Sequence, residues 1–203
     1  MTKPTARSRI IDAVVRCVDR GGLKSFALED VAAEAAVSRA TIYRHFPGGR
    51  QQLVEETVAR EVANFWKELS DEVRPLGSIE ERLVVGIMSA HTRIAQHDLL
   101  QRLIRSEPGD ILPPLVSADR TLHRLVVGYL RELLARESLR EDIDLDQAAE
   151  YLARMLLSHI GSAGRWDLND RAAVERLVRT QFVAGILAPE ASGAAGLRHT
   201  PSV

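Results

Sequence analysis

The sequence predicts an all-α protein with about nine helices. Apolar residues recur at spacings of three and four along most of the 203 positions, which is the period of a helix with one buried face. The alternating apolar pattern of strands joined by hairpin turns does not occur in the sequence. Apolar residues make up 45% of the chain, which is enough for a core that needs no disulfide.

Three helices are predicted near the N-terminus, over residues 6–20, 28–35 and 38–46. Gly21-Gly22 ends the first helix, since glycine favours helix termination. Ser38 is a good N-cap for the third helix because its hydroxyl can accept a hydrogen bond from the amide of Thr41. Pro47 ends this helix, which is therefore short.

The rest of the chain predicts six further helices, over residues 50–74, 79–94, 99–105, 122–134, 145–163 and 170–186. The fourth is long enough to link two parts of the molecule. Pro108-Gly109 and Pro113-Pro114 are expected to break the chain between the sixth and seventh helices, because proline cannot continue a helix.

The helical pattern divides the chain into an N-terminal domain, residues 1–50, a second domain, residues 51–188, and a tail, residues 189–203, without apolar periodicity. Residues 1–50 contain nine basic and five acidic side chains, which gives this segment a charge of +4. Because the whole chain has a net charge of -1, the remaining residues carry -5. A basic N-terminal segment followed by an acidic remainder indicates that only the N-terminal segment binds a polyanion.

Composition excludes a disulfide-stapled protein and a membrane protein. The single cysteine, Cys17, has no partner and lies at helical spacing among apolar residues, which predicts a buried structural thiol. No apolar run approaches the ~18 residues of a membrane span, and the N-terminus lacks the apolar region of a signal peptide. The expected protein is soluble and cytoplasmic, with no membrane partner.

The third predicted helix carries an unusual density of cationic and hydrogen-bonding side chains. At 100° per residue, Ile42 and Phe46 point to the core, whereas Ala40 and Arg44 lie nearly opposite. An arginine can donate two hydrogen bonds to one guanine, which contributes ~1–3 kcal/mol of discrimination between bases. Hydroxyl and imidazole groups on the flanks can donate to phosphate oxygens, which fixes register without reading sequence. This arrangement predicts a DNA-reading helix.

The predicted DNA-binding residues form three groups. Those that would face bases are Arg39, Ala40 and Arg44. Those that would face the backbone are Ser38, Thr41, Tyr43 and His45. A phosphate is also expected at the start of the fourth helix, where uncovered amides and a positive charge are supplied by Gly49 and Arg50.

The segment "FALEDVAAEAAVSRATIYRHFPGGRQQLV" strongly resembles the DNA-binding domain of tetracycline-repressor-type (TetR/AcrR) transcriptional regulators. The resemblance is close over residues 7–55 and extends to the remainder only in the nine-helix plan. It implies a ligand-responsive repressor, released from a palindromic operator by a small molecule. No enzymatic activity and no cofactor are expected. The resemblance also implies that helices four to seven enclose the effector pocket and that the last two long helices form a homodimer.

Three positions depart from the family pattern. Ala36 stands in the turn where glycine is usual, which requires either a left-handed alanine or another turn geometry. Ala27 stands where a serine or threonine usually caps the second helix, at a cost of ~1 kcal/mol and one phosphate contact. Gly49 replaces the usual lysine and leaves Arg50 as its substitute.

Candidate effector contacts are polar or aromatic side chains on otherwise apolar faces. They are Phe65, Trp66, Met88, His91, Arg102, Tyr129 and Met155. Each could instead be a core or a solvated surface residue. The expected effector is an apolar or amphipathic small molecule. The apolar stripes of the last two helices could pair with a second subunit in a four-helix interface, or pack within one subunit.

Two other classes of function compete with a DNA-binding regulator. An all-helical metal-dependent phosphohydrolase would need several His and Asp ligands around hard cations. His91 and His97 are six residues apart, about 240° around a helix, so they would point to different faces, and no metal site is expected. A helical partner-binding module without DNA contact is the other alternative.

Overall fold

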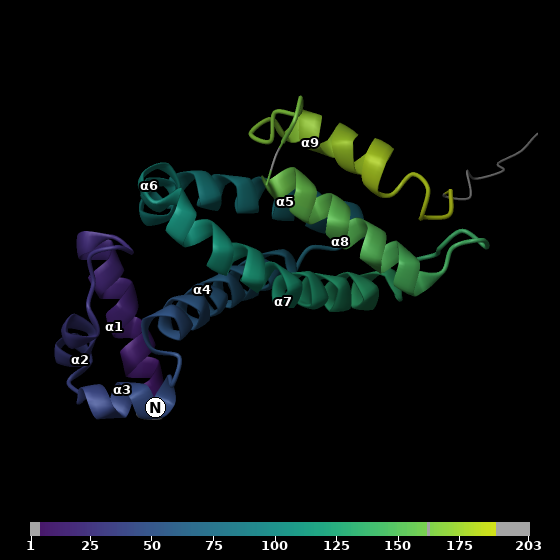
Figure 1. The fold of residues 1–203 in the computed structure, drawn as a ribbon. Coiled ribbons are helices and arrows are strands. Elements are labelled where there is room, and N and C mark those ends of the chain that lie inside the picture. Colours follow the sequence, from purple (N-terminus) through teal and green to yellow (C-terminus); the bar gives the residue numbers. More distant parts are fainter. Residues whose placement is uncertain (1–4, 162, 190–203) are drawn as a thin grey trace, which may run out of the picture.

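The regular structure of this chain is helical, as predicted, in a computed structural model that describes residues 5–161 and 163–189. One isolated antiparallel bridge, between Leu139 and Leu187, is the exception among these residues. Figure 1 shows the arrangement. The helices are α1 (Ala6–Gly21), α2 (Leu28–Ala35), α3 (Arg39–His45), α4 (Gly49–Val73), α5 (Ile79–Gln96), α6 (Asp98–Ser106), α7 (Pro108–Leu134), α8 (Leu145–Gly161) and α9 (Arg171–Leu177), followed by a π-helical turn (Val178–Phe182).

The first three helices and the start of α4 share one apolar core. Its fully buried members include Ile10, Val31, Ile42, Phe46 and Leu53, one or more from each helix or its end. The predicted N-cap of α3 forms: the hydroxyl of Ser38 accepts a hydrogen bond from the amide of Thr41 at 3.1 Å. This core holds α3 by its apolar edge and leaves its opposite face in solvent.

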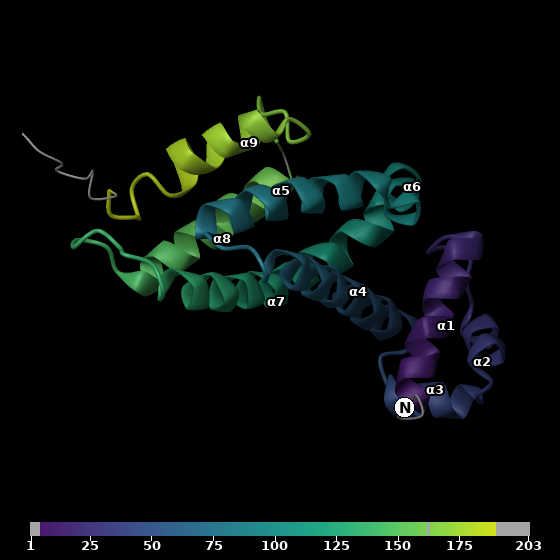
Figure 2. The same ribbon diagram turned by 180° about the vertical axis from the view of Figure 1, so that it is seen from behind.

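Helix α4 links the N-terminal helices to the body. It extends from the N-terminal unit of α1, α2 and α3 and runs along α7, as Figures 1 and 2 show from opposite sides. Leu53 belongs to the N-terminal core, whereas Leu69 and Val73 are buried farther along the helix. Helix α4 is therefore a continuous connection between the N-terminal core and the body.

The body core is formed by α5, α7, α8 and α9. Contacts join α7 to α4 and α8, and α5 to α8 and α9. The apolar stripes of the last two helices are buried in this core; they include Leu152, Leu156, Val174, Leu177 and Phe182. Packing within one subunit thus accounts for stripes that could also have been explained by a second copy.

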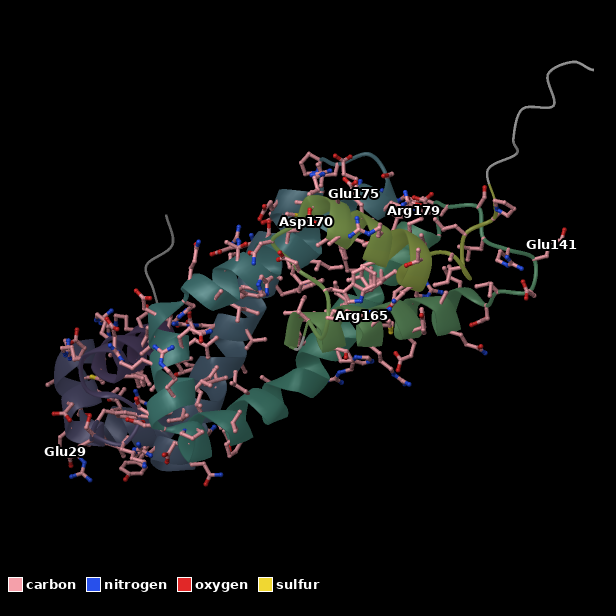
Figure 3. All side chains as sticks on the ribbon, turned by 90° about the horizontal axis from the view of Figure 1, so that it is seen from above. Glu29, Glu141, Arg165, Asp170, Glu175 and Arg179 are labelled. Carbon is pink, nitrogen blue, oxygen red and sulfur yellow. The ribbon has the colours of Figure 1, made fainter. Side chains whose placement is uncertain are left out.

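The outward face of the last two helices is polar. Gln147, Tyr151 and Arg154 are exposed on α8, Glu175 is exposed on α9, and Arg179 is exposed on the π-helical turn that follows. Figure 3 shows Asp170, Glu175 and Arg179 spread from the N-cap of α9 to this turn. A partner that approaches these helices therefore meets charged groups and one tyrosine rather than the predicted apolar stripes.

The helical prediction was wrong at Pro113-Pro114. Helix α7 begins at Pro108, where proline is well suited because the first amide of a helix needs no partner, and then continues through both prolines to Leu134. The amides of Asp110 and Ile111 donate to the carbonyl of Glu107 at 3.0 and 3.2 Å, so the first turn is already hydrogen-bonded. Burial of Ile111 at 3% exposure then holds this end of the helix despite two missing amide donors.

The end of the ninth helix also differs from the prediction. A single helix was expected to reach residue 186, but the α-helix gives way to a π-helical turn at Val178 and regular helix ends at Phe182. The hydroxyl of Tyr151 donates to the carbonyl of Gln181 at 2.7 Å, which satisfies one of the carbonyls in this turn. Of the predicted tail, only Pro189 lies among the described residues.

The N-terminal core is completed by residues from the body. Leu103 of α6 and Ile111 of α7 are buried in it. At the same junction the amide of Lys24 donates to a carboxylate oxygen of Glu107 at 3.1 Å, and the guanidinium of Arg102 donates to the carbonyl of Asp19 at 2.6 Å. The N-terminal helices and the body therefore share side chains at this junction. In the described part of the chain, no helix has the length and hydropathy needed to cross a bilayer.

Candidate nucleic-acid interface and ligand cavity

Helix α3 is anchored on one side and exposed on the other. Ile42 and Phe46 have 0% exposure, whereas Ala40, Tyr43 and Arg44 are exposed. The helix therefore presents the face on which the sequence predicts base contacts. Its seven residues are too few to be stable alone, so the buried edge fixes the orientation of the exposed side chains.

The three predicted base-contacting residues all lie on the exposed surface. Arg39 forms an ion pair with Glu29 of α2, with 2.6 Å between the guanidinium nitrogen and the carboxylate oxygen and both side chains 57% exposed. Figure 3 places Glu29 at the outer edge of the N-terminal helices. Exposed pairs of this kind contribute at most about 1 kcal/mol, so Arg39 can exchange Glu29 for another acceptor.

The predicted phosphate-contacting residues flank this face. The hydroxyls of Ser38 and Thr41 lie 3.0 Å apart in the first turn of α3. Tyr43 is 44% exposed, and His45 is half-buried. A Cβ atom at Gly49 would lie 3.6 Å from the Tyr43 ring, so the tyrosine rests beside the start of α4.

Gly49 is buried, and Arg50, although exposed, has its guanidinium bound to the loop between α1 and α2. The amide of Gly49 donates to the carbonyl of Phe46 at 2.9 Å, so it is not free for a phosphate. The guanidinium of Arg50 lies 4.6 Å from the centre of the Phe26 ring and donates to the carbonyl of Leu23. These contacts join the start of α4 to the loop between α1 and α2, more than 20 residues away in sequence, which is why local pattern did not indicate them.

The three departures from the family pattern have structural explanations. Gly49 has φ of 62°, a left-handed conformation that a lysine would adopt only with strain. Ala36 also has a left-handed backbone, with φ of 52° and ψ of 50°, so the turn keeps the usual geometry at an energetic cost. Ala27 supplies no side-chain cap, although its amide donates to the carboxylate of Asp30 at 2.8 Å.

Ala36→Gly is expected to raise the free energy of unfolding by about 1 kcal/mol, because glycine removes the steric cost of the left-handed backbone. Chemical denaturation measures the change. Ala35→Gly is the matched control: Ala35 is helical and buried, so the same substitution one residue earlier should lower stability by about 1 kcal/mol. Equal effects of the two substitutions would contradict the strain at Ala36.

Two of the seven predicted effector contacts lie together on a cavity in the body. Trp66 of α4 and Tyr129 of α7 pack edge to face, with ring centres 5.7 Å apart and an interplanar angle of 84°. Both line a cavity of about 20 Å³ between α4, α5, α7 and α8, which has room for about one water molecule. Apolar side chains form most of its wall, including Leu69, Leu83 and Leu130.

The polar groups of this cavity come from Ser70, Arg82 and Tyr129. The hydroxyl of Ser70 donates to the carbonyl of Trp66 at 2.8 Å, so it is already used. The hydroxyl of Tyr129 is buried and donates no hydrogen bond to a described residue. Burial raises the pKa of Tyr129, whereas the charge of Arg82, the approach of its guanidinium as a hydrogen-bond donor, and the charge of Arg74 act against that rise. Arg82 was not predicted because a charged residue in the first turn of a helix normally lies in solvent.

The other five predicted effector contacts do not line the cavity. Met88 and Met155 are half-buried against the body core. Phe65 and His91 are half-buried on α4 and α5. Arg102 is hydrogen-bonded to Asp19, so it joins α6 to α1.

The histidines that suggested a metal enzyme have no ligand geometry. His97 lies between α5 and α6, and its Nδ1 accepts a hydrogen bond from the amide of Leu100 at 3.2 Å, which caps α6. Within residues 5–161 and 163–189, no group of three His, Cys, Asp or Glu side chains is placed to hold a metal ion.

The α2-turn-α3 arrangement, with its buried edge and exposed arginines, defines a helix-turn-helix DNA-binding protein. Residues 10–57 match the family model described as bacterial regulatory proteins, tetR family. An uncharacterized HTH-type transcriptional regulator of Mycobacterium tuberculosis is 24% identical over 194 residues, which cover 96% of this chain and 91% of that protein. The N-terminal helices of this chain therefore match the DNA-binding domain of the TetR family, and the protein is a DNA-binding transcriptional regulator.

Solved structures of the family have the same fold. The repressor AlkX of Dietzia sp. is 24% identical, with a TM-score of 0.57 over 88% of this chain and 95% of that one. RolR in complex with resorcinol is 19% identical, with a TM-score of 0.58 over 89% of this chain and 90% of that one.

Proposed function

We propose that this regulator is a repressor that reads a palindromic operator through α3 and leaves it when a small molecule enters the body cavity. The observation that carries the proposal is the exposed face of α3 above the buried Ile42 and Phe46. Base readout is assigned to Arg39, Ala40 and Arg44. Phosphate contacts are assigned to Ser38, Thr41, Tyr43 and His45. Gly49 and Arg50 are assigned instead to fixing the start of α4 beside α3.

The route from cavity to DNA follows two helices. Helix α4 lines the cavity with Trp66 and begins at Gly49, next to Tyr43. Helix α7 contributes Tyr129 to the cavity wall, and the N-terminal end of α7 packs into the N-terminal core through Ile111. A molecule larger than the present cavity must separate these two helices, and the N-terminal unit is attached to both. The RolR complex with resorcinol supports control of this fold by a small molecule.

A homodimer is part of the proposal because a palindromic site presents two half-sites. Two reading helices must then lie roughly 34 Å apart, one turn of DNA. The outer faces of α8 and α9 are assigned to the interface, with Gln147, Arg154 and Glu175 as contacts in place of the internally packed apolar stripes. The proposed boundaries are residues 1–50 for DNA binding and 51–188 for effector binding and dimerisation. The regulator is assigned to the cytoplasm, with no catalytic activity.

Binding to DNA from upstream of the regulated genes is expected to weaken steeply as salt rises. The logarithm of affinity should fall against the logarithm of salt concentration with a slope near -0.9 for each phosphate neutralised. Fluorescence anisotropy with a labelled duplex measures the slope, and a scrambled duplex of equal length is the control. Binding that is absent, or that does not respond to salt, would contradict the proposed function.

A further inference from the structure

The cavity between Trp66 and Tyr129 contains a buried hydroxyl, that of Tyr129, which donates its proton to no described residue. Buried hydroxyls are nearly always paired, because an unpaired one loses its water without compensation. A ligand atom that accepts a hydrogen bond at this point would supply the missing partner.

The charge around this hydroxyl is positive. Arg82 lines the cavity, and its Nε donates to the carbonyl of Leu76 at 2.8 Å, which holds the guanidinium at the wall. A guanidinium can donate but cannot accept hydrogen bonds. The residues that line the cavity include no Asp or Glu side chain. These groups together favour an oxygen that accepts and carries negative charge.

The apolar part of the cavity wall favours a ligand with a flat apolar group of limited length. Trp66 and Tyr129 supply two aromatic rings, and Leu69, Leu83 and Leu130, each at most 3% exposed, close the surroundings. The present volume of about 20 Å³ holds about one water molecule, so the wall must part for any ligand. Separation of the two aromatic rings would admit a single further ring, which can stack on either.

We propose that the effector is a one-ring aromatic carboxylate, with its ring between Trp66 and Tyr129 and its carboxylate at the Tyr129 hydroxyl and the Arg82 guanidinium. This inference rests on the proposed function and names the chemical class of its effector. Burial of an anion against a fixed guanidinium and a hydroxyl satisfies both polar groups of the cavity. The same ring forces apart α4 and α7, the helices that reach the N-terminal unit.

Benzoate is the probe, and Trp66 is the reporter. The sequence has two tryptophans, so Trp166→Phe leaves Trp66 as the single emitter. Benzoate should change its fluorescence saturably. Tyr129→Phe in this background should weaken benzoate binding about tenfold, the effect of one hydrogen bond to a charged group. Toluene, which has the ring without the carboxylate, should bind both proteins equally.

Two further variants separate hydrogen bonding from general damage. Tyr151→Phe is the matched control, because Tyr151 lies on α8 outside the cavity and bonds to Gln181, so benzoate affinity should not change. Gly86→Ala adds a methyl group to the cavity wall at ordinary contact, 3.8 Å from Val73, and should weaken both probes. The melting temperature of unliganded Tyr129→Phe should change little, since the lost hydroxyl donates to no described residue.

The inference is overturned if Tyr129→Phe binds benzoate as well as the parent does, or if toluene binds the parent as tightly as benzoate. Operator binding is measured separately, without probe. A protein that binds its operator and is released by another molecule, but not by benzoate, has the proposed function and a different effector class. A protein that does not bind any operator lacks the proposed function whatever the cavity binds.

Discussion

Phe46→Ala is expected to lower the free energy of unfolding by about 3–5 kcal/mol and to abolish DNA binding. Phe46 has 0% exposure at the C-terminal end of α3, and the guanidinium of Arg7 lies 5.1 Å from the centre of its ring. Its loss removes the side chain that holds α3 to α1 and leaves a cavity in a small core. Urea denaturation followed by circular dichroism measures the stability, and anisotropy with operator DNA measures the binding.

Tyr43→Ala is the matched control for Phe46→Ala. Tyr43 lies three residues earlier on the same helix and is 44% exposed, so its truncation should change stability by about 0.5 kcal/mol or less while DNA binding weakens. An undiminished stability of Phe46→Ala would contradict the assignment of Phe46 as the anchor of the reading helix.

Arg44→Ala is expected to reduce the preference for operator over scrambled DNA by roughly tenfold to a hundredfold. Arg44 lies on the exposed face of α3, and a bidentate contact to guanine contributes ~1–3 kcal/mol of discrimination. Competition binding with operator and scrambled duplexes measures the ratio of affinities. The affinity for scrambled DNA should fall less than the ratio of operator to scrambled affinity, because phosphate contacts supply most of the affinity for any DNA.

Two controls define the role of Arg44. Arg136→Ala removes an exposed cation from the loop after α7, at the end of α7 that lies far from α3 in Figure 1, and should leave both affinities unchanged. Tyr43→Phe should weaken operator and scrambled DNA equally, since a phosphate contact carries no sequence information. The proposed division of roles fails if Arg44→Ala reduces both affinities equally while Tyr43→Phe changes the preference.

Sequence alone predicted the elements whose signals are local. The third helix was placed within one residue at each end, because Ser38 caps it and Pro47 follows it. Ser78 and Asp144 also act as predicted caps, accepting from the amides of Glu81 and Gln147 at 3.1 and 2.9 Å. These interactions span three residues, so the pattern of residue types contains the information.

Interactions between distant segments were missed. Helix α7 passes through Pro113-Pro114 because Ile111 is buried against helices of the N-terminal core, which no local rule describes. Arg50 was assigned to phosphate because its partners, Leu23 and Phe26, lie on another loop. A charge at the start of a helix has the same local pattern in either role.

The cavity was predicted only through its aromatic residues. Trp66 and Tyr129 were chosen as aromatic groups on apolar stripes, and the fold brings their rings into contact. Arg82 and Gly86 were not chosen, since a charged residue near a helix start and a glycine within a helix have no local feature that places them on a cavity. Only the packing of α5 against α4 and α7 does so.

Hydrogen exchange of the whole chain with and without operator DNA tests the central claim, that α3 and its supports form the DNA-binding surface. Binding stabilises the contacted segments against local opening, so exchange there should slow. The account predicts the largest slowing over residues 28–50 and little change on the exposed face of α9. Slowing concentrated on α9, with residues 28–50 unchanged, would contradict it.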